Sequence, residues 1–136
     1  MAIPNGAGGY QVGDGNLSEV TLGVQSAPFS VAATATLTAA QVTSGLLLVG
    51  AGATAAQTYT LPTAAAIEAI VSSAKANSTF ELVLVNTGTS SGTGALALGT
   101  GITDGGNATV AVAVTSAGRF LFRKTADNAY TVYRTA

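Results

Sequence analysis

The chain has 136 residues, which suits one domain that buries roughly two-thirds of its extended-chain surface. Charged residues are only 8% of the chain and the formal net charge is −1, so no basic surface for nucleic acid is present. Cysteine and histidine are absent, which excludes disulfides, thiolate metal sites and imidazole-based acid–base chemistry. No apolar run approaches the about 18 residues of a membrane-spanning helix. A chain with so few charges has little to keep its surface in water, so we expect partner subunits or proteins to bury that surface.

Residues 1–28 are rich in glycine and begin MAIPNGAGG. Ordering glycine costs the most backbone entropy, so we expect no independent helix or strand here. No basic region is followed by an apolar core, so no signal peptide is expected. Two interpretations stay open, a solvated tail and an extended arm that becomes ordered on a neighbour. We favour the arm, because apolar side chains would otherwise stay in water; its predicted anchors are Ile3, Tyr10, Val12 and Leu17.

Residues 29–136 are predicted to form a single β-rich domain. Alternation of apolar residues with serine and threonine predicts a strand over 29–37. Thr38, followed by helix formers and closed by Gly45, predicts one short helical turn. Gly-rich or turn-rich sequence over 50–56 and 99–107 predicts loops. Further short strands are predicted at 46–49, 58–61, 80–85, 95–98 and 108–114.

The one longer helix is predicted over about 63–75. Thr63 has the side chain of an N-cap, and Lys75 complements the helix dipole at the C-terminal end. The apolar residues of the segment recur at helical spacing and would face the core. They are Ala66, Ile67, Ile70, Val71 and Ala74.

Residues 118–134 are predicted to form a β-hairpin that turns at 126–128. Side chains alternate along a strand, which places Phe120, Phe122 and Lys124 on one face and Arg119, Leu121 and Arg123 on the other. Arg134 is expected to join the two arginines from the second strand. Three guanidinium groups on one face would bind acidic side chains of another subunit, although a solvated outer face is an equal alternative. The predicted partner-binding arginines are Arg119, Arg123 and Arg134.

The predicted fold class is therefore mainly β. About eight short strands with one α-helix favour a compact β-sandwich or a small β-barrel, preceded by the extended N-terminal arm of residues 1–28. No internal repeat of fixed period is evident.

Two motifs suggest either a chemical function or an ordinary loop or turn. In both cases we favour the loop or turn. Residues 50–55 follow a hydrophobic strand and match G-x-G-x-x-A, the form of a dinucleotide fingerprint. That chemistry needs a helix to begin there, and a strand pattern ended by Pro62 follows instead. Asp104 lies in a TDGGN sequence that suggests either a turn or a calcium ligand, and calcium loops need more acidic or amide ligands. We expect no catalytic residues, no metal and no cofactor.

Several segments together resemble small virion proteins of tailed bacteriophages, and are most similar to capsid decoration (cement) proteins. The segments begin with LTAAQV at 37–42, TYTLPT at 58–63 and FEL at 80–82, followed by VNTG at 85–88. The hairpin supplies the last two. They are GRF with RKT at 118–125, and TVYR at 131–134.

This resemblance implies a compact β-rich homotrimer on the outer capsid surface of the virion, made in the host cytoplasm. It implies binding to the major capsid protein where capsid subunits meet, which stabilises the head. No nucleic acid, membrane or small-molecule substrate is expected, and the protein is not expected to be an enzyme. The alternative within virions is a tail-fibre or baseplate domain that binds host-surface glycan. The absence of tryptophan disfavours it; a small hydrolase built from scattered Asp and Ser residues is the weakest alternative.

Overall fold

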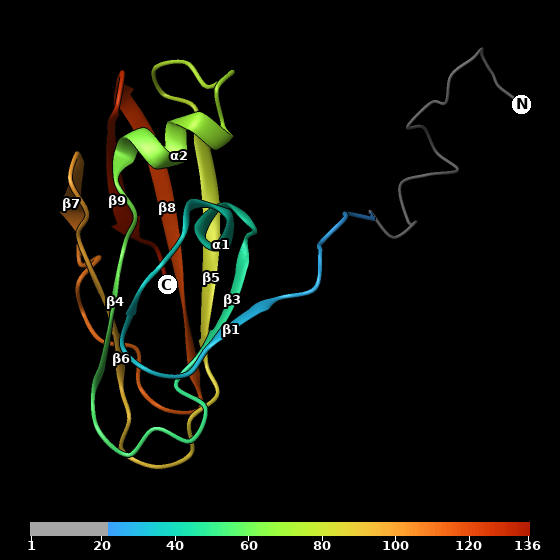
Figure 1. The fold of residues 1–136 in the computed structure, drawn as a ribbon, viewed down its shortest axis with the longest axis vertical. Helices are drawn as coiled ribbons and strands as arrows, with labels where there is room; N and C mark the ends of the chain where they lie inside the picture. The colour runs from blue at the N-terminus through green and yellow to red at the C-terminus, as the bar shows by residue number, and fades with distance from the viewer. Residues whose placement is uncertain (1–21) are drawn as a thin grey trace, which may run out of the picture.

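The computed structural model describes residues 22–136 of the chain. This part is mainly β, with nine strands in two sheets and two helices (Figure 1). In chain order the elements are β1 (Phe29–Val31), β2 (Ala35–Thr36), α1 (Ala39–Thr43), β3 (Leu46–Val49), β4 (Gln57–Thr60), α2 (Ala64–Ile70), β5 (Thr79–Asn86), β6 (Gly94–Ala97), β7 (Ile102–Gly106), β8 (Ser116–Ala126) and β9 (Ala129–Arg134).

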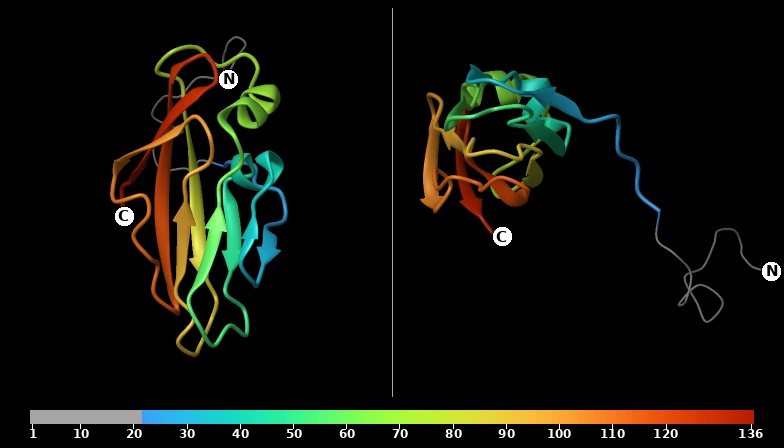
Figure 2. Two further views of the ribbon diagram at one scale, coloured as in Figure 1. Left: turned by 60° about the vertical axis from the view of Figure 1, so that its left-hand side comes forward. Right: turned by 90° about the horizontal axis from the view of Figure 1, so that it is seen from below.

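The first six strands form three consecutive pairs, β1 with β2, β3 with β4 and β5 with β6. We call each pair a rung, and the three rungs stack in parallel. Each rung places one strand in a six-stranded sheet, ordered β1-β3-β5-β8-β9-β7, and the next in a three-stranded sheet, ordered β2-β4-β6. All four pairings between rungs are parallel, and the strands of the two sheets run in opposite directions (Figure 2). Partners lie 18 residues apart in the first step (29 and 47) and 37 apart in the second (46 and 83). The unequal spacing explains why the sequence shows no fixed period.

The β8–β9 hairpin closes one side of this stack. β5 pairs with β8 and β8 pairs with β9, both antiparallel, whereas β7 pairs parallel with β9 at the far edge. The predicted turn is confirmed, since β8 ends at Ala126 and β9 begins at Ala129. Asn128 adopts a positive φ of 54° there, a conformation that asparagine tolerates better than most residues.

Both predicted helix starts are confirmed in atomic detail. Thr38 caps α1 through a capping box, in which its side chain accepts from the Gln41 N–H and the Gln41 side chain accepts from the Thr38 N–H. The Thr63 side chain caps α2 by accepting from the Ala66 N–H. Gly45, which follows α1, has a φ of +91°, where a side chain would be strained.

Four predicted element bounds are wrong. The single strand at 29–37 is two strands, β1 and β2, that belong to different sheets. The helix at 63–75 ends at Ile70, and a turn follows. Residues 99–107, expected as a loop, contain β7. Residues 108–114, expected as a strand, form only an isolated bridge between Val112 and Gly94.

One hydrophobic core is shared by both sheets and both helices. Three aromatic side chains of β8 and β9 are buried in it, namely Phe120, Phe122 and Tyr130, and Phe80 stacks on Phe122 with ring centroids 4.8 Å apart. Tyr59 brings the three-stranded sheet into the same cluster. No helix within residues 22–136 has the length and apolarity needed to cross a bilayer.

Candidate interaction site

A buried lysine ties helix α2 to the hairpin. Lys124 on β8 is only 5% exposed, because the core face of β8 directs it toward α2. Its Nζ lies 2.8 Å from Glu68 Oε1 and 3.5 Å from Asp127 Oδ1, and it donates to the Ala74 carbonyl at 3.0 Å. The hydrogen bond with Glu68 raises the pKa of Lys124 more than burial lowers it. The cluster therefore holds an ammonium group in place rather than supplying a neutral amine.

Tyr130 lies beside this cluster with its hydroxyl buried. Within residues 22–136 that hydroxyl has no hydrogen-bond partner. Burial raises the pKa of Tyr130, the charge of Glu68 adds to the rise, and Lys124 opposes it. The raised pKa keeps the phenol of Tyr130 protonated at neutral pH, next to an ion pair whose ammonium group is already bound by Glu68, Asp127 and the Ala74 carbonyl. We assign these residues a structural role.

The three predicted arginines do not share a face. Arg119 and Arg123 lie on the outer face of β8 as expected, and Phe120, Phe122 and Lys124 point inward. Arg134, however, pairs with Phe120 in the β8–β9 register, so its side chain belongs to the opposite face. Its guanidinium lies over the Phe120 ring, 5.9 Å from the centroid. The prediction of a three-arginine cluster is therefore wrong for Arg134.

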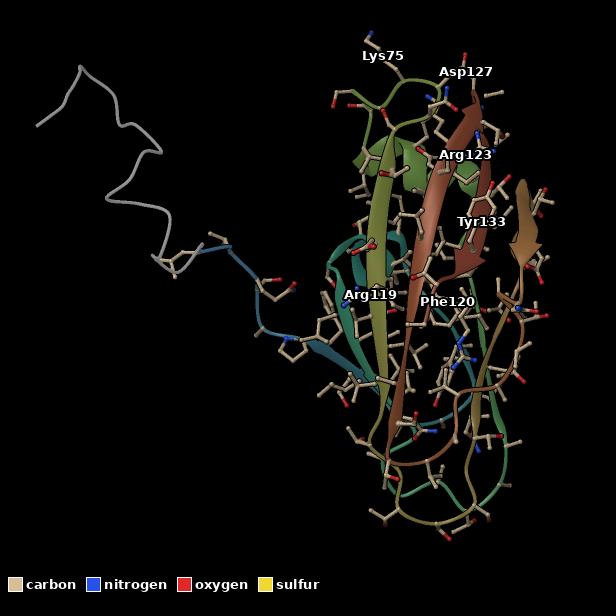
Figure 3. All side chains as sticks on the ribbon, turned by 180° about the vertical axis from the view of Figure 1, so that it is seen from behind. Lys75, Arg119, Phe120, Arg123, Asp127 and Tyr133 are labelled. Atoms are coloured by element: carbon tan, nitrogen blue, oxygen red, sulfur yellow. The ribbon has the colours of Figure 1, made fainter. Side chains whose placement is uncertain are left out.

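Each arginine has a different environment. Arg123 donates from Nη1 to Asn77 Oδ1 at 2.9 Å and from Nη2 to the Tyr133 hydroxyl at 3.0 Å (Figure 3). Arg134 donates to the main-chain carbonyls of Ala136, Val110 and Ala111. It lines an open hollow of about 510 Å³, but its donors are directed to these carbonyls. Of the three arginines, Arg119 is the one whose side chain makes no hydrogen bond or ion pair within the described residues.

Of the two motifs with a chemical alternative, the glycine-containing one forms a loop after β3, and Asp104 lies in strand β7. The glycine-containing segment after β3 leads into β4 and not into a helix, so no helix N-terminus meets a phosphate there. The Asp104 carboxylate accepts from the Ala108 and Gly106 N–H groups. These bonds, the one from Ala108 most of all, lower the pKa of Asp104. Residues 22–136 contain no cluster of three or more acidic side chains that suits a metal ion.

The strongest candidate for an interaction is the segment that leads into β1. The predicted anchors Ile3, Tyr10, Val12 and Leu17 lie outside the described residues. Residues 22–28 run in extended form away from the two sheets (Figures 1 and 2). Leu22 is 86% exposed and Val24 is 103% exposed, the two largest values among the exposed large hydrophobic residues. Apolar side chains in this state favour contact with another surface.

Gln25 fixes the point at which this segment leaves the body. Its side-chain amide donates to the Ser44 carbonyl at 2.7 Å, and its Oε1 would lie only 3.1 Å from a Cβ at Gly45. The chain is thus attached at residue 25, and Leu22 and Val24 project beyond it. The predicted anchors omitted Leu22 and Val24. Their spacing of two residues, typical of one face of a strand, was the available signal.

No protein-family model, curated protein or solved structure matches this chain.

Proposed function

We propose that the chain is a virion structural protein that decorates the outer capsid. In this role it binds where major capsid subunits meet and stabilises the head as a homotrimer. The single observation that carries the proposal is the exposed pair Leu22 and Val24, held on an extended segment attached at Gln25. Two such apolar side chains on a charge-poor chain support a role in binding other proteins.

The resemblance to decoration proteins supports the same assignment, because its segments include both confirmed helix caps and both strands of the hairpin. The proposed mechanism is mechanical. Several weak contacts per chain, multiplied by the symmetry of a trimer, hold neighbouring capsid subunits together through avidity. We assign the chain no catalytic residue, cofactor, nucleic acid or membrane in this role.

This proposal also includes a more specific description of the fold than a mainly β chain. We take the two sheets as the layers of a β-sandwich, and residues 1–28 as an arm. Support comes from the core that both sheets share and from the extended course of residues 22–28.

The proposal is tested by mixing the purified chain with heads of the phage that encodes it and sedimenting the mixture. We expect the unaltered chain to sediment with the heads in high copy number. The double substitution Leu22→Ser with Val24→Ser should reduce the bound fraction by at least tenfold. Val110→Ser is the matched control, because Val110 is also an exposed valine, at 52%, but lies far along the chain from the segment. A chain that stays in the supernatant with every head preparation contradicts the proposal.

A further inference from the structure

Strands β3 and β5 carry apolar side chains on both faces of the six-stranded sheet. The sequence of β3 is LLLV, and that of β5 is TFELVLVN. Nearly continuous apolar runs are typical of strands buried on both faces, whereas a strand with one face in water alternates apolar and polar residues. The inner face of both strands lies in the core. On the opposite face, which we call the outer sheet face, the side chains are only half-buried; they are Leu46, Leu48, Val83 and Val85.

No helix or strand within residues 22–136 covers the outer sheet face. Figure 3 looks onto this face, and neither a helix nor another strand lies in front of β5 and β8. Both helices and the three-stranded sheet contribute to the core on the inner side. Leu121 of β8 extends the apolar surface, because it pairs with a residue of β5 on the same face. The sequence pattern of β3 and β5 therefore predicts a cover that this part of the chain does not supply.

Two charges of opposite sign lie on the outer sheet face. Arg119 is opposite Val83 and Glu81 is opposite Leu121 in the β5–β8 register, so the two charged residues are diagonal neighbours on adjacent strands. Both are exposed. Neither forms an ion pair within residues 22–136, where both ion pairs involve Lys124. A partner that suits this face therefore presents apolar side chains together with one carboxylate and one cation.

We propose that the outer sheet faces of two copies of the chain pack against each other around a two-fold axis. An axis that lies in the interface and passes between Arg119 and Glu81 brings Arg119 of each copy to Glu81 of the other, because a two-fold contact is self-complementary. The same axis places the apolar side chains of the two faces together, at the about 10 Å separation of packed sheets. Both charges of each copy are then paired, and one surface supplies everything that the other lacks.

The size of the sheet suits such a contact. At about 3.4 Å per residue and about 4.8 Å between strands, the six strands present roughly 600 Å². Each partner buries about 800 Å² in a standard interface, which is of the same order. The contact goes beyond the proposed function and does not use Leu22 or Val24. Where the chain also forms the proposed trimer, the contact joins two trimers, so the number of copies is even in either case.

Charge reversal tests the contact, with solution mass measured by light scattering over a concentration series. Arg119→Glu places carboxylates against each other across the axis, and Glu81→Arg does the same with guanidinium groups. Each variant alone should associate at least about tenfold more weakly than the unaltered chain, because like charges then meet. A mixture of the two variants should regain the unaltered mass, about 26 kDa for two copies of 13.2 kDa, because every introduced charge faces its opposite. The matched control Lys75→Glu reverses an exposed charge at the far end of the molecule (Figure 3) and should leave the mass unchanged.

Three outcomes overturn the inference. The first needs no variant: the unaltered chain keeps the mass of one copy or of three copies at every concentration. In the second, the mixed variants associate no better than each alone, which is the result when Arg119 and Glu81 pair only within one copy. In the third, both single variants keep the unaltered mass. Far-UV circular dichroism checks that each variant is folded. None of these measurements uses a capsid, so a chain of one or three copies that binds heads contradicts only this inference, and an even-numbered assembly that ignores heads contradicts only the proposed function.

Discussion

The sequence between Leu22 and Ile67 contains no charged residue, whereas β8, β9 and their turn contain Arg119, Arg123, Lys124, Asp127 and Arg134. The uncharged region (residues 22–67) consists of parallel rungs held by main-chain pairing and apolar burial. The C-terminal hairpin (residues 116–134) adds a buried ion pair and guanidinium contacts. Both of its strands lie inside the six-stranded sheet, with β5 on one side and the edge strand β7 on the other. The difference teaches that this chain concentrates its charged contacts in the hairpin, because both ion pairs within residues 22–136 involve Lys124.

The largest expected effect comes from substituting Asn86, which lies between the strands of these two regions. Asn86 pairs with Val49 of β3 on one side and with Ser116 of β8 on the other. Its buried amide donates to the Gly92 and Val112 carbonyls and accepts from the Gly88 N–H.

We expect Asn86→Ala to lower the free energy of unfolding by about 2 kcal/mol or more, because the buried Gly92 carbonyl and Gly88 N–H lose their partner at roughly 1 kcal/mol each or more, whereas the Val112 carbonyl still accepts from the Gly94 N–H. Urea unfolding measures the loss. The control Ser90→Ala, exposed in the following loop, should change the free energy by less than about 0.5 kcal/mol. Equal losses for the two variants would contradict the assigned role of Asn86.

The second prediction concerns the ion pair that distinguishes the hairpin. The pKa of Lys124 is raised in the folded chain, so its contribution to stability is complete below the unfolded value of about 10.5 and is lost as the pH rises through the folded value. Lys124→Met should destabilise the chain at pH 8 and flatten this loss between about pH 10 and pH 12. Urea midpoints across that range measure it. A variant that keeps the full alkaline loss would show that Lys124 does not cause it.

The smallest expected effects come from one tyrosine in each region. The Tyr59 hydroxyl donates to the Ala32 carbonyl at 2.9 Å and accepts from the Gly50 N–H at 3.1 Å, whereas the Tyr130 hydroxyl has no partner within residues 22–136. Tyr59→Phe should cost about 1–2 kcal/mol of unfolding free energy, since it leaves buried groups unpaired. Tyr130→Phe should be neutral or slightly stabilising, because it removes a buried hydroxyl that has no bond to lose. Thermal unfolding of both variants compares them, and a reversed order would contradict the comparison.

Local chemistry was predictable from the sequence, and long-range pairing was not. The caps Thr38 and Thr63, the glycine at 45 and the division of the β8 side chains between two faces each depend on neighbours within a few residues, and all were predicted. The split between β1 and β2 depends on which of two sheets accepts each half of an alternating pattern. No local signal carries that information. Helix α2 ends at Ile70, and the Ala74 carbonyl in the turn beyond it accepts from Lys124, fifty residues further along the chain.

The candidate site was predictable only in part. The sequence indicated an N-terminal arm within 1–28, and the contact of Gln25 with Ser44 could not be read from it. The arginine hypothesis failed at Arg134 because the register of β8 with β9 decides its face, and a shift of one residue moves every side chain to the other side. Lys124 was placed correctly on the same face as Phe120 and Phe122. Its partner Glu68 lies on a helix whose position depends on the whole stack.

The parallel stacking of the rungs has a consequence for how stability is distributed. In a stacked array, each unit is stabilised by its interfaces with the units on either side. The middle rung, β3 with β4, has two such interfaces, and the last rung has the hairpin in addition. The first rung, β1 with β2, has only one. Local opening therefore begins at the first rung, and a neighbouring molecule that covers it acts as the terminal cap of the array.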